Sequence, residues 1–326
     1  MAIDMHSHHY GGLVASLRDR TQRPTVSTDA AGRFVLNAMT ASTVMSDGYT
    51  AIDARMAFLD REGLSRQLVT FPGAHGVDAL PVDEALTIVR ATNDHLAEIC
   101  RQSGGRLIGL GGLPLADTTL AAAEMVRVRR ELGLLGAILP GNYFMSVAAM
   151  EQLHSVLSAA NRVRALVMVH PGLMPGELPP APYADASVLR ASALNLQASL
   201  SHMVVTVATS GVLDRYPDVA FQVVNLGGTL PFILERIDAI AATRELPALV
   251  TVEKLRRMVY DTASLGPRAI ELAVKVIGAD RMMLGTDYPI FEPVGVRGSV
   301  LDAEIPDACK HAILDGTAEA VIKARG

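Results

Sequence analysis

Two histidines separated by one residue lie near the start of the chain, in the segment Asp4-Met5-His6-Ser7-His8-His9. If this segment is a strand, residues two apart point to the same side, so His6 and His8 share a face. Two imidazoles on one face can bind one divalent ion, and imidazole suits zinc and its neighbours. Such pairs often occur without a metal, so the position of this pair at a strand end carries the argument.

Two other apolar runs end in a side chain that can bind a metal. The run Leu166–Val169 ends at His170, and Pro171 follows directly. The run Met283–Thr286 ends at Asp287, again just before a proline turn. A hydrogen-bonded structural role is the alternative for His170, while Asp287 could instead orient a water or cap a loop.

The spacing of apolar residues indicates how these side chains are positioned. Short β-branched runs alternate with stretches of helical period, which is the pattern of repeated βα units. Strands are predicted at Ala2–His6, Gln67–Phe71, Leu107–Leu113, Gly136–Leu139, Ala165–His170, Ala220–Asn225, Met258–Thr262 and Arg281–Thr286. Helices are predicted at Asp53–Glu62, Val82–Gln102, Thr118–Leu132, Ala148–Ala160, Ser187–Leu213, Leu230–Ala242, Pro267–Ile277 and Pro306–Lys323. Eight strands, each followed by a helix, favour an α/β fold of the closed (β/α)8 (TIM) barrel type over an open sheet.

A barrel would bring the candidate ligands together. The C-terminal ends of its strands meet at the mouth, where active sites lie. His6 and His8, His170 and Asp287 end the first, fifth and eighth predicted strands, so they would meet there. Three or four protein ligands with one open position describe a catalytic zinc site. Such an ion lowers the pKa of a bound water and polarises a substrate oxygen.

Two segments interrupt the βα rhythm. Residues 11–50 have little helical period and are predicted to be a small insertion after strand 1. Residues 171–186 are rich in proline and form a long predicted loop. Either segment could be a functional lid or a solvated connector. The whole chain, residues 1–326, is predicted to be a single barrel domain.

Composition narrows the class of protein. Half of the residues are hydrophobic and 19% are charged, which permits a large core. The net charge is −5, without a basic block, so nucleic-acid binding is not expected; the cluster Arg127, Arg129 and Arg130 is interpreted as a solvated helix face. Cys100 and Cys309 lie far apart and fit a reducing compartment. No signal peptide or membrane-spanning run is recognisable, so a cytoplasmic location without membrane contact is expected.

The motifs DMHSHH, MVHPG, NLGGTLPFILERID and MLGTDYP, together with GVLDRYPD, resemble the amidohydrolase superfamily. The similar branch contains aminocarboxymuconate semialdehyde decarboxylase and γ-resorcylate decarboxylase. The resemblance implies that the metal ligands are His6, His8, His170 and Asp287, which usually hold Zn2+ and in some members Mn2+. It also implies that Arg55 binds a substrate carboxylate, although an arginine near a helix start is by itself more often a surface residue.

The chain departs from the family pattern at Asn225. The family places a histidine there, which acts as acid or base, and asparagine cannot take up a proton near neutral pH. Asn225 can still hydrogen-bond a water or the substrate. Three explanations are open: His75 or His9 supplies the proton, the natural chemistry has diverged, or an engineered His-to-Asn change slows turnover. We therefore predict Asp287, Asn225 and His75 as catalytic residues, and Arg55, Asn225 and His9 as substrate-binding residues.

Three functional hypotheses follow. The first is a metal-dependent non-oxidative decarboxylase, a carboxy-lyase, that acts on a small aromatic or muconate-like carboxylic acid. The second is a hydrolase or hydratase of the same superfamily that uses metal-activated water. The third is a silent barrel retained for binding, against which the intact ligand set argues. The resemblance also suggests a homodimer or higher homo-oligomer. The remaining histidines in helical patterns are predicted to be surface or packing residues: His95, His154, His202 and His311.

Overall fold

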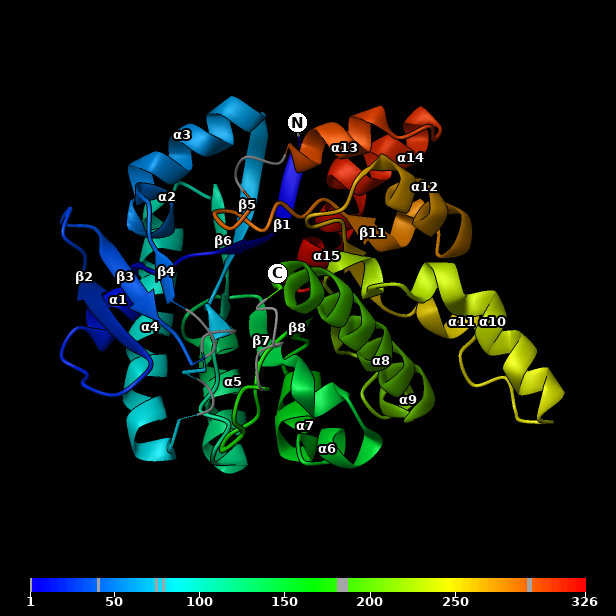
Figure 1. The fold of residues 1–326 in the computed structure, drawn as a ribbon, viewed down its shortest axis with the longest axis horizontal. Helices are drawn as coiled ribbons and strands as arrows, with labels where there is room; N and C mark the ends of the chain where they lie inside the picture. The colour runs from blue at the N-terminus through cyan, green and yellow to red at the C-terminus, as the bar shows by residue number, and fades with distance from the viewer. Residues whose placement is uncertain (1, 40–41, 74–75, 78–79, 181–186, 292–294) are drawn as a thin grey trace.

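A barrel of eight parallel strands forms the centre of the molecule (Figure 1). The structure is a computed structural model, and it describes all residues except 1, 40–41, 74–75, 78–79, 181–186 and 292–294. The strands follow one another in chain order in the sheet. They are β1 (Ala2–His8), β5 (Leu64–Thr70), β6 (Leu107–Gly111), β7 (Gly136–Pro140), β8 (Leu166–His170), β9 (Ala220–Val223), β10 (Val259–Asp261) and β11 (Met282–Met283). All eight predicted strands are therefore present.

The last strand returns to the first. The backbone N–H of Met5 donates to the Leu284 carbonyl over 2.7 Å, and the N–H of Asp287 donates to the His6 carbonyl over 2.7 Å. These bonds close the sheet on itself. The predicted (β/α)8 barrel is confirmed. Every residue of β1, β7 and β8 is buried, as expected for strands covered by helices on one side and by the barrel interior on the other.

Helices surround the barrel. They are α3 (Ile52–Glu62), α4 (Val82–Gln102), α5 (Thr118–Arg130), α6 (Val147–Glu151), α7 (His154–Arg162), α8 (Leu196–Thr209), α9 (Val212–Arg215), α10 (Leu230–Thr243), α11 (Val252–Leu255), α12 (Pro267–Val276), α13 (Val296–Asp302), α14 (Asp307–His311) and α15 (Thr317–Lys323). The predicted helix Ala148–Ala160 is two helices. The predicted helix Ser187–Leu213 is also divided, because Gly211 adopts a left-handed φ of 75° between α8 and α9.

Backbone conformation also explains an early strand end. The strand predicted at Ala220–Asn225 stops at Val223 in the structure. Asn225 and Leu226 have φ angles of 52° and 54°, which a strand cannot contain. Asn225 therefore belongs to a tight turn at the C-terminal end of β9, which carries its side chain to the mouth of the barrel.

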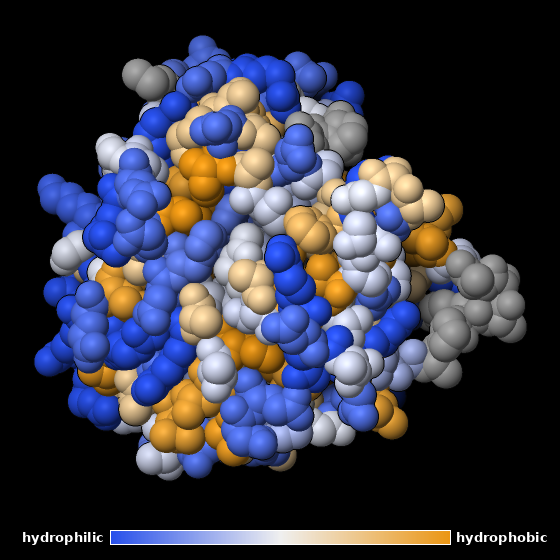
Figure 2. Space-filling view, turned by 90° about the vertical axis from the view of Figure 1, so that its left-hand side faces the viewer, coloured by the Kyte–Doolittle hydropathy of each residue, from blue (hydrophilic) through white to orange (hydrophobic). Residues whose placement is uncertain are grey.

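The predicted insertion at 11–50 contains a small sheet of its own. It consists of α1 (Gly11–Leu17), the antiparallel strands β2 (Thr25–Thr28), β3 (Phe34–Asn37) and β4 (Ser42–Val44), and α2 (Asp47–Thr50). Helix α1 packs against α4. Hydrophilic and hydrophobic residues are interspersed on the face of the molecule on this side (Figure 2). The interpretation of the whole chain as a single domain stays a prediction.

No helix in the described part of the chain is long and apolar enough to cross a membrane.

Candidate metal centre

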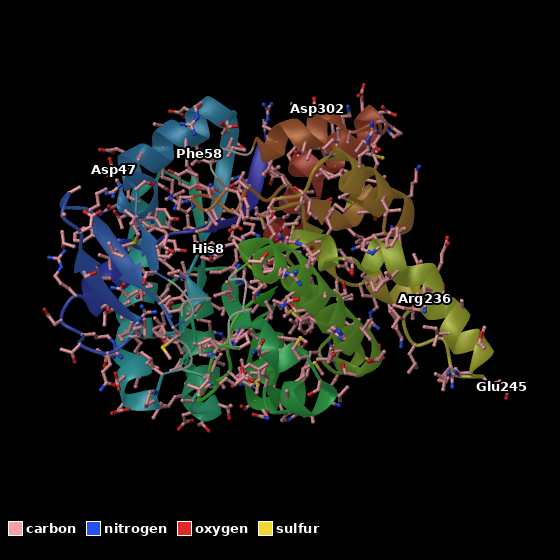
Figure 3. All side chains as sticks on the ribbon, viewed as in Figure 1. His8, Asp47, Phe58, Arg236, Glu245 and Asp302 are labelled. Carbon is pink, nitrogen blue, oxygen red and sulfur yellow. The ribbon has the colours of Figure 1, made fainter. Side chains whose placement is uncertain are left out.

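Three histidines meet at the C-terminal ends of the barrel strands. His6 and His8 come from β1, and His170 comes from β8 on the far side of the barrel. One ring nitrogen of each lies within 4.8 Å of one ring nitrogen of the others, and all three residues are buried. Figure 3 shows His8 among the barrel strands near the middle of the molecule. The structure thus brings together side chains that are more than 160 residues apart in the sequence.

Two of these rings are held by groups that only accept hydrogen bonds. His6 Nδ1 lies 3.1 Å from Asp261 Oδ1, and His170 Nδ1 lies 3.0 Å from the Pro171 carbonyl oxygen. Because a carboxylate and a carbonyl cannot donate, Nδ1 of each ring must carry the proton. In the neutral form of each ring, Nε2 then keeps its lone pair. This is the tautomer and orientation that metal-binding histidines commonly have.

The third ring, His8, is held by a hydroxyl group. Its Nδ1 lies 2.6 Å from Thr70 Oγ1 at the end of β5. The neighbouring strand therefore orients the ring. The Thr70 hydroxyl can accept from Nδ1, and Nε2 of His8, which lies 3.2 Å from Asp287 Oδ1, is then the candidate ligand atom of this ring.

The fourth predicted ligand lies beside the histidines. Asp287 Oδ1 is 3.2 Å from His8 Nε2 and 3.6 Å from His6 Nε2. Among the described residues, His6 Nε2 and Asp287 Oδ1 are buried without any hydrogen-bond partner. Buried polar atoms are rarely left without a partner. Three imidazoles and one carboxylate with these orphaned atoms fit a divalent metal ion such as zinc.

The pKa values of the clustered side chains are shifted in opposite directions. Burial raises the pKa of Asp287 above its usual range. Burial, and then the neighbouring His8 and His6, lower the pKa of His170 to about 3. Burial also lowers the pKa of His6, but the Asp261 and Asp287 carboxylates outweigh it and raise that pKa to about 9. Closely packed groups with opposed proton affinities are typical of functional sites.

Asp261 is a member of the site that the sequence analysis missed. It ends β10, and besides His6 it accepts from Gln222 Nε2 over 2.9 Å and from the Asn225 backbone N–H over 3.1 Å. Burial opposes its ionisation, but His6 and these donors hold the pKa of Asp261 below its usual value. The sequence contains the same signal for Asp261 as for Asp287, because each of these carboxylates ends an apolar run.

Gly285 allows two of these side chains to approach each other. A Cβ atom at this position would lie 2.9 Å from the Cβ atoms of both His6 and Asp261. Such short contacts would force one of them to move. Glycine at 285 therefore permits the close packing of β1, β10 and the end of β11 beneath the candidate ion site.

A buried network fixes the strand that carries two of the histidines. Asp4, fully buried in β1, accepts from the Gln67 side chain over 2.7 Å and from the Thr286 backbone N–H over 2.9 Å. These bonds tie β1 to β5 on one side and to the segment after β11 on the other. His6 and His8 thus project from a strand that both neighbours hold in register.

The amidohydrolase family pattern matches residues 3–323, nearly the whole chain. The chain belongs to this family. The resemblance inferred from the motifs is therefore confirmed.

Among curated relatives, the chain is 28% identical over 276 residues to 2-amino-3-carboxymuconate-6-semialdehyde decarboxylase of Dictyostelium discoideum, covering 82% of this chain and 75% of that protein. It is 28% identical over 283 residues to γ-resorcylate decarboxylase of Rhodococcus jostii (strain RHA1), covering 77% and 80%. The fold also matches that of dihydroxybenzoic acid decarboxylase from Polaromonas sp. JS666, solved with bound manganese and an inhibitor, 2-nitroresorcinol. That match has a TM-score of 0.74 at 21% identity over 100% and 97% of the two chains.

Arg55 of this amidohydrolase lies against β1 and β5. Its fully buried guanidinium donates to Ser7 Oγ over 3.1 Å, to Gln67 Oε1 over 2.6 Å and to the His8 carbonyl oxygen. The group also lies over the Tyr288 ring, 4.9 Å from its centroid. Substrate binding by Arg55 stays a prediction, whereas the described contacts support a role in positioning the strand that carries His8.

His9 directly follows β1, and its ring lies against α4. Its ring stacks on the His95 ring from α4, with 3.1 Å between the two Nε2 atoms. Burial, and then Arg55 and His95, keep the pKa of His9 well below its usual value. His95 is thus a packing residue, as predicted. Substrate binding by His9 stays a prediction, and its described contacts are with the protein.

Asn225 lies in the turn after β9, nearly fully buried. Its side-chain amide donates to Ser264 Oγ over 3.0 Å, and its backbone N–H donates to the Asp261 carboxylate that holds His6. The position where the family has a histidine is therefore connected to the metal centre through Asp261. His75, the other predicted catalytic residue, lies outside the described residues.

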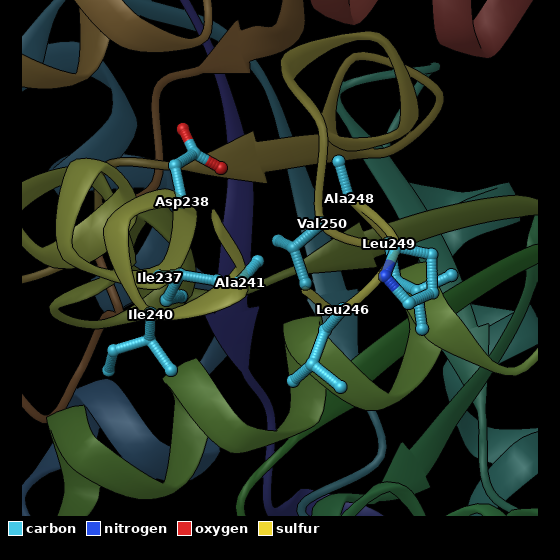
Figure 4. A pocket seen from close by; sticks show the side chains of 9 residues that line it. Ile237, Asp238, Ile240, Ala241, Leu246, Ala248, Leu249 and Val250 are labelled. Carbon is cyan, nitrogen blue, oxygen red and sulfur yellow. The ribbon is translucent and has the colours of Figure 1, made fainter. Parts of the chain in front are cut away.

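An apolar pocket lies elsewhere, at helix α10. It has a volume of about 300 Å³ between α10, with Ile237, Ile240 and Ala241, and the segment 246–250 that follows it (Figure 4). Figure 3 shows Arg236 and Glu245 on this projecting part, well apart from His8. None of the predicted ligands lines this pocket, so it is separate from the metal centre.

Proposed function

We propose that the chain is a metal-dependent non-oxidative decarboxylase, a carboxy-lyase, for a small aromatic or muconate-like carboxylic acid. The observation that carries the proposal is the buried cluster of His6, His8 and His170 beside Asp287, in which one ring nitrogen of each histidine lies within 4.8 Å of those of the others. The decarboxylase names of the two curated relatives support the choice of reaction.

These four side chains would hold a divalent ion, Zn2+ in the first place and Mn2+ as the alternative. Imidazole nitrogen suits zinc, and a carboxylate oxygen is acceptable to both metals. When bound, the ion supplies a positive charge that holds the substrate oxygens and stabilises negative charge as it develops. The manganese in the structurally similar dihydroxybenzoic acid decarboxylase supports the alternative metal.

The reaction itself requires one proton and releases one CO₂. A proton bonds to the carbon that bears the carboxylate, and the electron pair of the C–C bond returns to that carbon's π system as CO₂ leaves. Asp287 is the candidate to move this proton, since its Oδ1 lies 3.2 Å from His8 Nε2 and is buried without a hydrogen-bond partner among the described residues. His75 is the second candidate. Asn225, with Arg55 and His9 as further proposed contacts, would orient the substrate through hydrogen bonds.

The test is an incubation of purified protein, loaded with Zn2+ or Mn2+, with a panel of carboxylic acids that includes 2,6-dihydroxybenzoate and 5-carboxyvanillate. We expect CO₂ release, one CO₂ per product molecule, and one deuterium at the former carboxylate carbon when the reaction runs in D₂O. A His8→Ala variant serves as the control. CO₂ release that is equal in this variant and in the unchanged chain would contradict the proposal.

A second candidate function rests on Asn225. A hydrolase or hydratase would use metal-activated water, and the absence of the family's proton-transferring histidine at this position makes that chemistry a real competitor. The same incubations in ¹⁸O-water separate the two functions. Incorporation of ¹⁸O without CO₂ release favours the hydrolase or hydratase.

We also propose that the chain forms a homodimer or higher homo-oligomer through helix α10 and the segment after it. Three side chains that line the apolar pocket together, Ile240, Leu246 and Leu249, are 47%, 57% and 44% exposed. Phe232, near the start of the same helix, is 79% exposed. Monomeric proteins rarely expose contiguous apolar patches of large area. A second copy of the chain would cover these side chains together with the adjoining apolar pocket.

Light scattering after size-exclusion chromatography tests this interface. We expect the mass of at least two chains, and a shift to the monomer in a Phe232→Ser, Leu246→Ser double variant. Val44→Ser, which alters an exposed valine of β4 in the insertion, is the matched control and should leave the mass unchanged. A monomeric unchanged chain at micromolar concentration would contradict the proposal.

A further inference from the structure

Five arginine side chains line one pocket at the end of the barrel opposite to the histidines. Arg129 and Arg130 end α5, Arg162 ends α7, Arg164 precedes β8, and Arg325 follows α15. The pocket has a volume of about 220 Å³. It lies at the N-terminal end of β8, and His170 lies at the C-terminal end of that strand. At about 3.3 Å per residue, the length of β8 separates the two sites by roughly 13 Å.

These arginines form no direct ion pair within the described part of the chain, although the Asp218 carboxylate lies close enough to act on the charge of Arg325. Among the described residues, none of the five forms an ion pair with a carboxylate. The contrast with Arg127, on the same helix, is direct, because its guanidinium pairs with Asp94 at 2.7 Å and with Glu124 at 2.7 Å. Unneutralised charges of one sign repel one another, and a protein gathers them in a concave site chiefly to attract a ligand of the opposite sign.

One of the five is fixed by the backbone, and another, Arg325, has a buried donor without a partner in the part of the chain that the structure describes. Arg129 donates from Nε to the Val163 carbonyl over 3.2 Å, from Nη1 to the Leu134 carbonyl over 2.7 Å, and from Nη2 to the Arg325 carbonyl. Burial lowers the pKa of Arg325, Arg164 and Arg129 lower it further, and the Asp218 carboxylate opposes them only in part. The buried Nε of Arg325 has no hydrogen-bond partner among the described residues. This donor is unsatisfied, and the positive charge around it is offset only in part.

We propose that this pocket binds a multiply charged phosphate-bearing anion, of the class of pyrophosphate or a phosphate ester. Guanidinium groups match phosphate oxygens with paired, planar N–H donors. Several arginines call for more than one negative charge, which a single carboxylate does not provide. The volume is several times the roughly 30 Å³ that one water molecule occupies in the liquid, so a diphosphate has room.

The anion would connect three separate parts of the chain. Arg129 and Arg130 belong to α5, Arg162 and Arg164 flank the connection between α7 and β8, and Arg325 belongs to the C-terminal segment. The sequence interpretation of this arginine cluster as a solvated helix face therefore needs correction at Arg129, which is half-buried and bonded to backbone carbonyls. A bound anion would offset the repulsion and stabilise the fold without touching the metal centre.

The test is calorimetric titration of the full chain with sodium pyrophosphate at constant ionic strength, with inorganic phosphate and citrate as separate arms. We expect one site per chain, with pyrophosphate tighter than phosphate. We also expect a rise in Tm of about 4 °C at about 100 times the Kd. Citrate binding at least as tight as that of pyrophosphate would overturn the choice of phosphate. If pyrophosphate shows no saturable binding at concentrations up to about 10 mM, which is weaker than the weakest specific binding expected, the proposed site is wrong.

An Arg130→Gln, Arg164→Gln double variant removes two charges without removing any hydrogen bond described for these two side chains. We expect pyrophosphate binding to weaken by about 10-fold or more, as for charged donors lost from an anion site. The Tm without ligand should stay the same or rise, which shows that the variant folds. The control Arg236→Gln, Arg244→Gln on and just after α10 removes the same charge elsewhere. If both double variants weaken binding equally, the effect is only net charge and the proposal is wrong.

Discussion

Each end of the barrel contains a cluster of side chains that repel one another, but the hydrogen-bond partners of the two clusters differ. At the C-terminal end, His6 and His170 each have an acceptor behind them that fixes the ring and leaves one free nitrogen in front. At the N-terminal end, Arg129 is fixed in a comparable way by backbone carbonyls, but its neighbours Arg130 and Arg164 have no described partner. The first arrangement fits a small cation at short range, whereas the second fits a larger anion held by charge.

This difference shows that the way the surrounding structure holds the side chains determines which kind of ion a site can bind. Metal ligation needs atoms placed within tenths of an ångström, so the histidines sit on strands that hydrogen bonds hold in register. Attraction of an anion falls off slowly with distance, so side chains near helix ends suffice even where they are partly exposed. Substitutions at one end of the barrel should therefore leave ion binding at the other end unchanged.

The largest effect is expected from His8→Ala. Losing one of four ligands should reduce bound metal to below about a tenth of an equivalent after gentle purification, because an incomplete site holds an ion weakly. Decarboxylation should be lost with the metal. Elemental analysis and CO₂ release measure the two effects. Arg130→Gln, at the other end, should retain full metal, and a metal-replete His8→Ala protein would show that His8 is not a ligand.

The next largest effect is expected from Asp261→Asn. The substitution keeps the shape of the side chain but removes the charge that accepts from His6 Nδ1. Loss of such a supporting partner commonly weakens metal binding by about 10–100-fold. Competition with a fluorescent chelator measures the change. The control Asp218→Asn removes a carboxylate near the arginine pocket, and an equal loss of affinity in both variants would contradict the assigned role.

A smaller effect is expected from Gly285→Ala. The added methyl group would crowd His6 and Asp261, and overpacking of this kind typically destabilises by about 1–3 kcal/mol. Urea denaturation measures the loss, and metal affinity should fall with it. Gly298→Ala in α13 is the matched control, because a Cβ there meets nothing within 4 Å. A stable Gly285→Ala protein with normal metal affinity would show that this close approach is unimportant.

The smallest effect is expected from pH, in protein stripped of metal with a chelator. The pKa of His170 is about 3 in the folded protein, against about 6.5 for an unfolded histidine. Between these values only the unfolded state takes up the proton, so stability is fully present above pH 6.5 and falls as the pH drops toward 3. The slope from this one group should not exceed about 1.4 kcal/mol per pH unit.

Denaturation curves from pH 7 to pH 4 measure this slope in the unchanged chain and in His170→Gln. In His170→Gln, the dependence of the free energy of unfolding on pH should be shallower by the contribution of one proton. In Arg164→Gln, at the arginine pocket, the dependence should be the same as in the unchanged chain. A slope that is the same in the unchanged chain and in His170→Gln would refute the low pKa of this histidine.

Much of the site could be predicted from local sequence. An apolar run that ends in His170 or Asp287 indicates both a buried strand and a functional side chain at its end. The eight predicted strands and the closed barrel then followed from the repetition of that pattern, and the structure confirms both. Strand ends were less predictable, as β9 shows, because the left-handed backbone at Asn225 and Leu226 depends on the turn they make with neighbouring elements.

The partners of the site residues could not be predicted in the same way. Asp261 and His6 are 255 residues apart, and nothing local to either one indicates that they meet. Arg55 offered only a position near a helix start, yet the fold buries it completely beneath β1 and β5. The arginines of the N-terminal pocket come from three separate segments, so only folding reveals that they share one space.

The sequence by itself determined which residues could bind a metal and on which strands they lie, because strand periodicity and apolar runs are local properties. The tertiary structure alone decided how those residues are held, which ring nitrogen each histidine turns toward the centre, and that a second cluster of charge lies at the opposite end. Hydrogen-bond partners and the summed field of charges depend on distances in space, and those distances exist only once the barrel has closed.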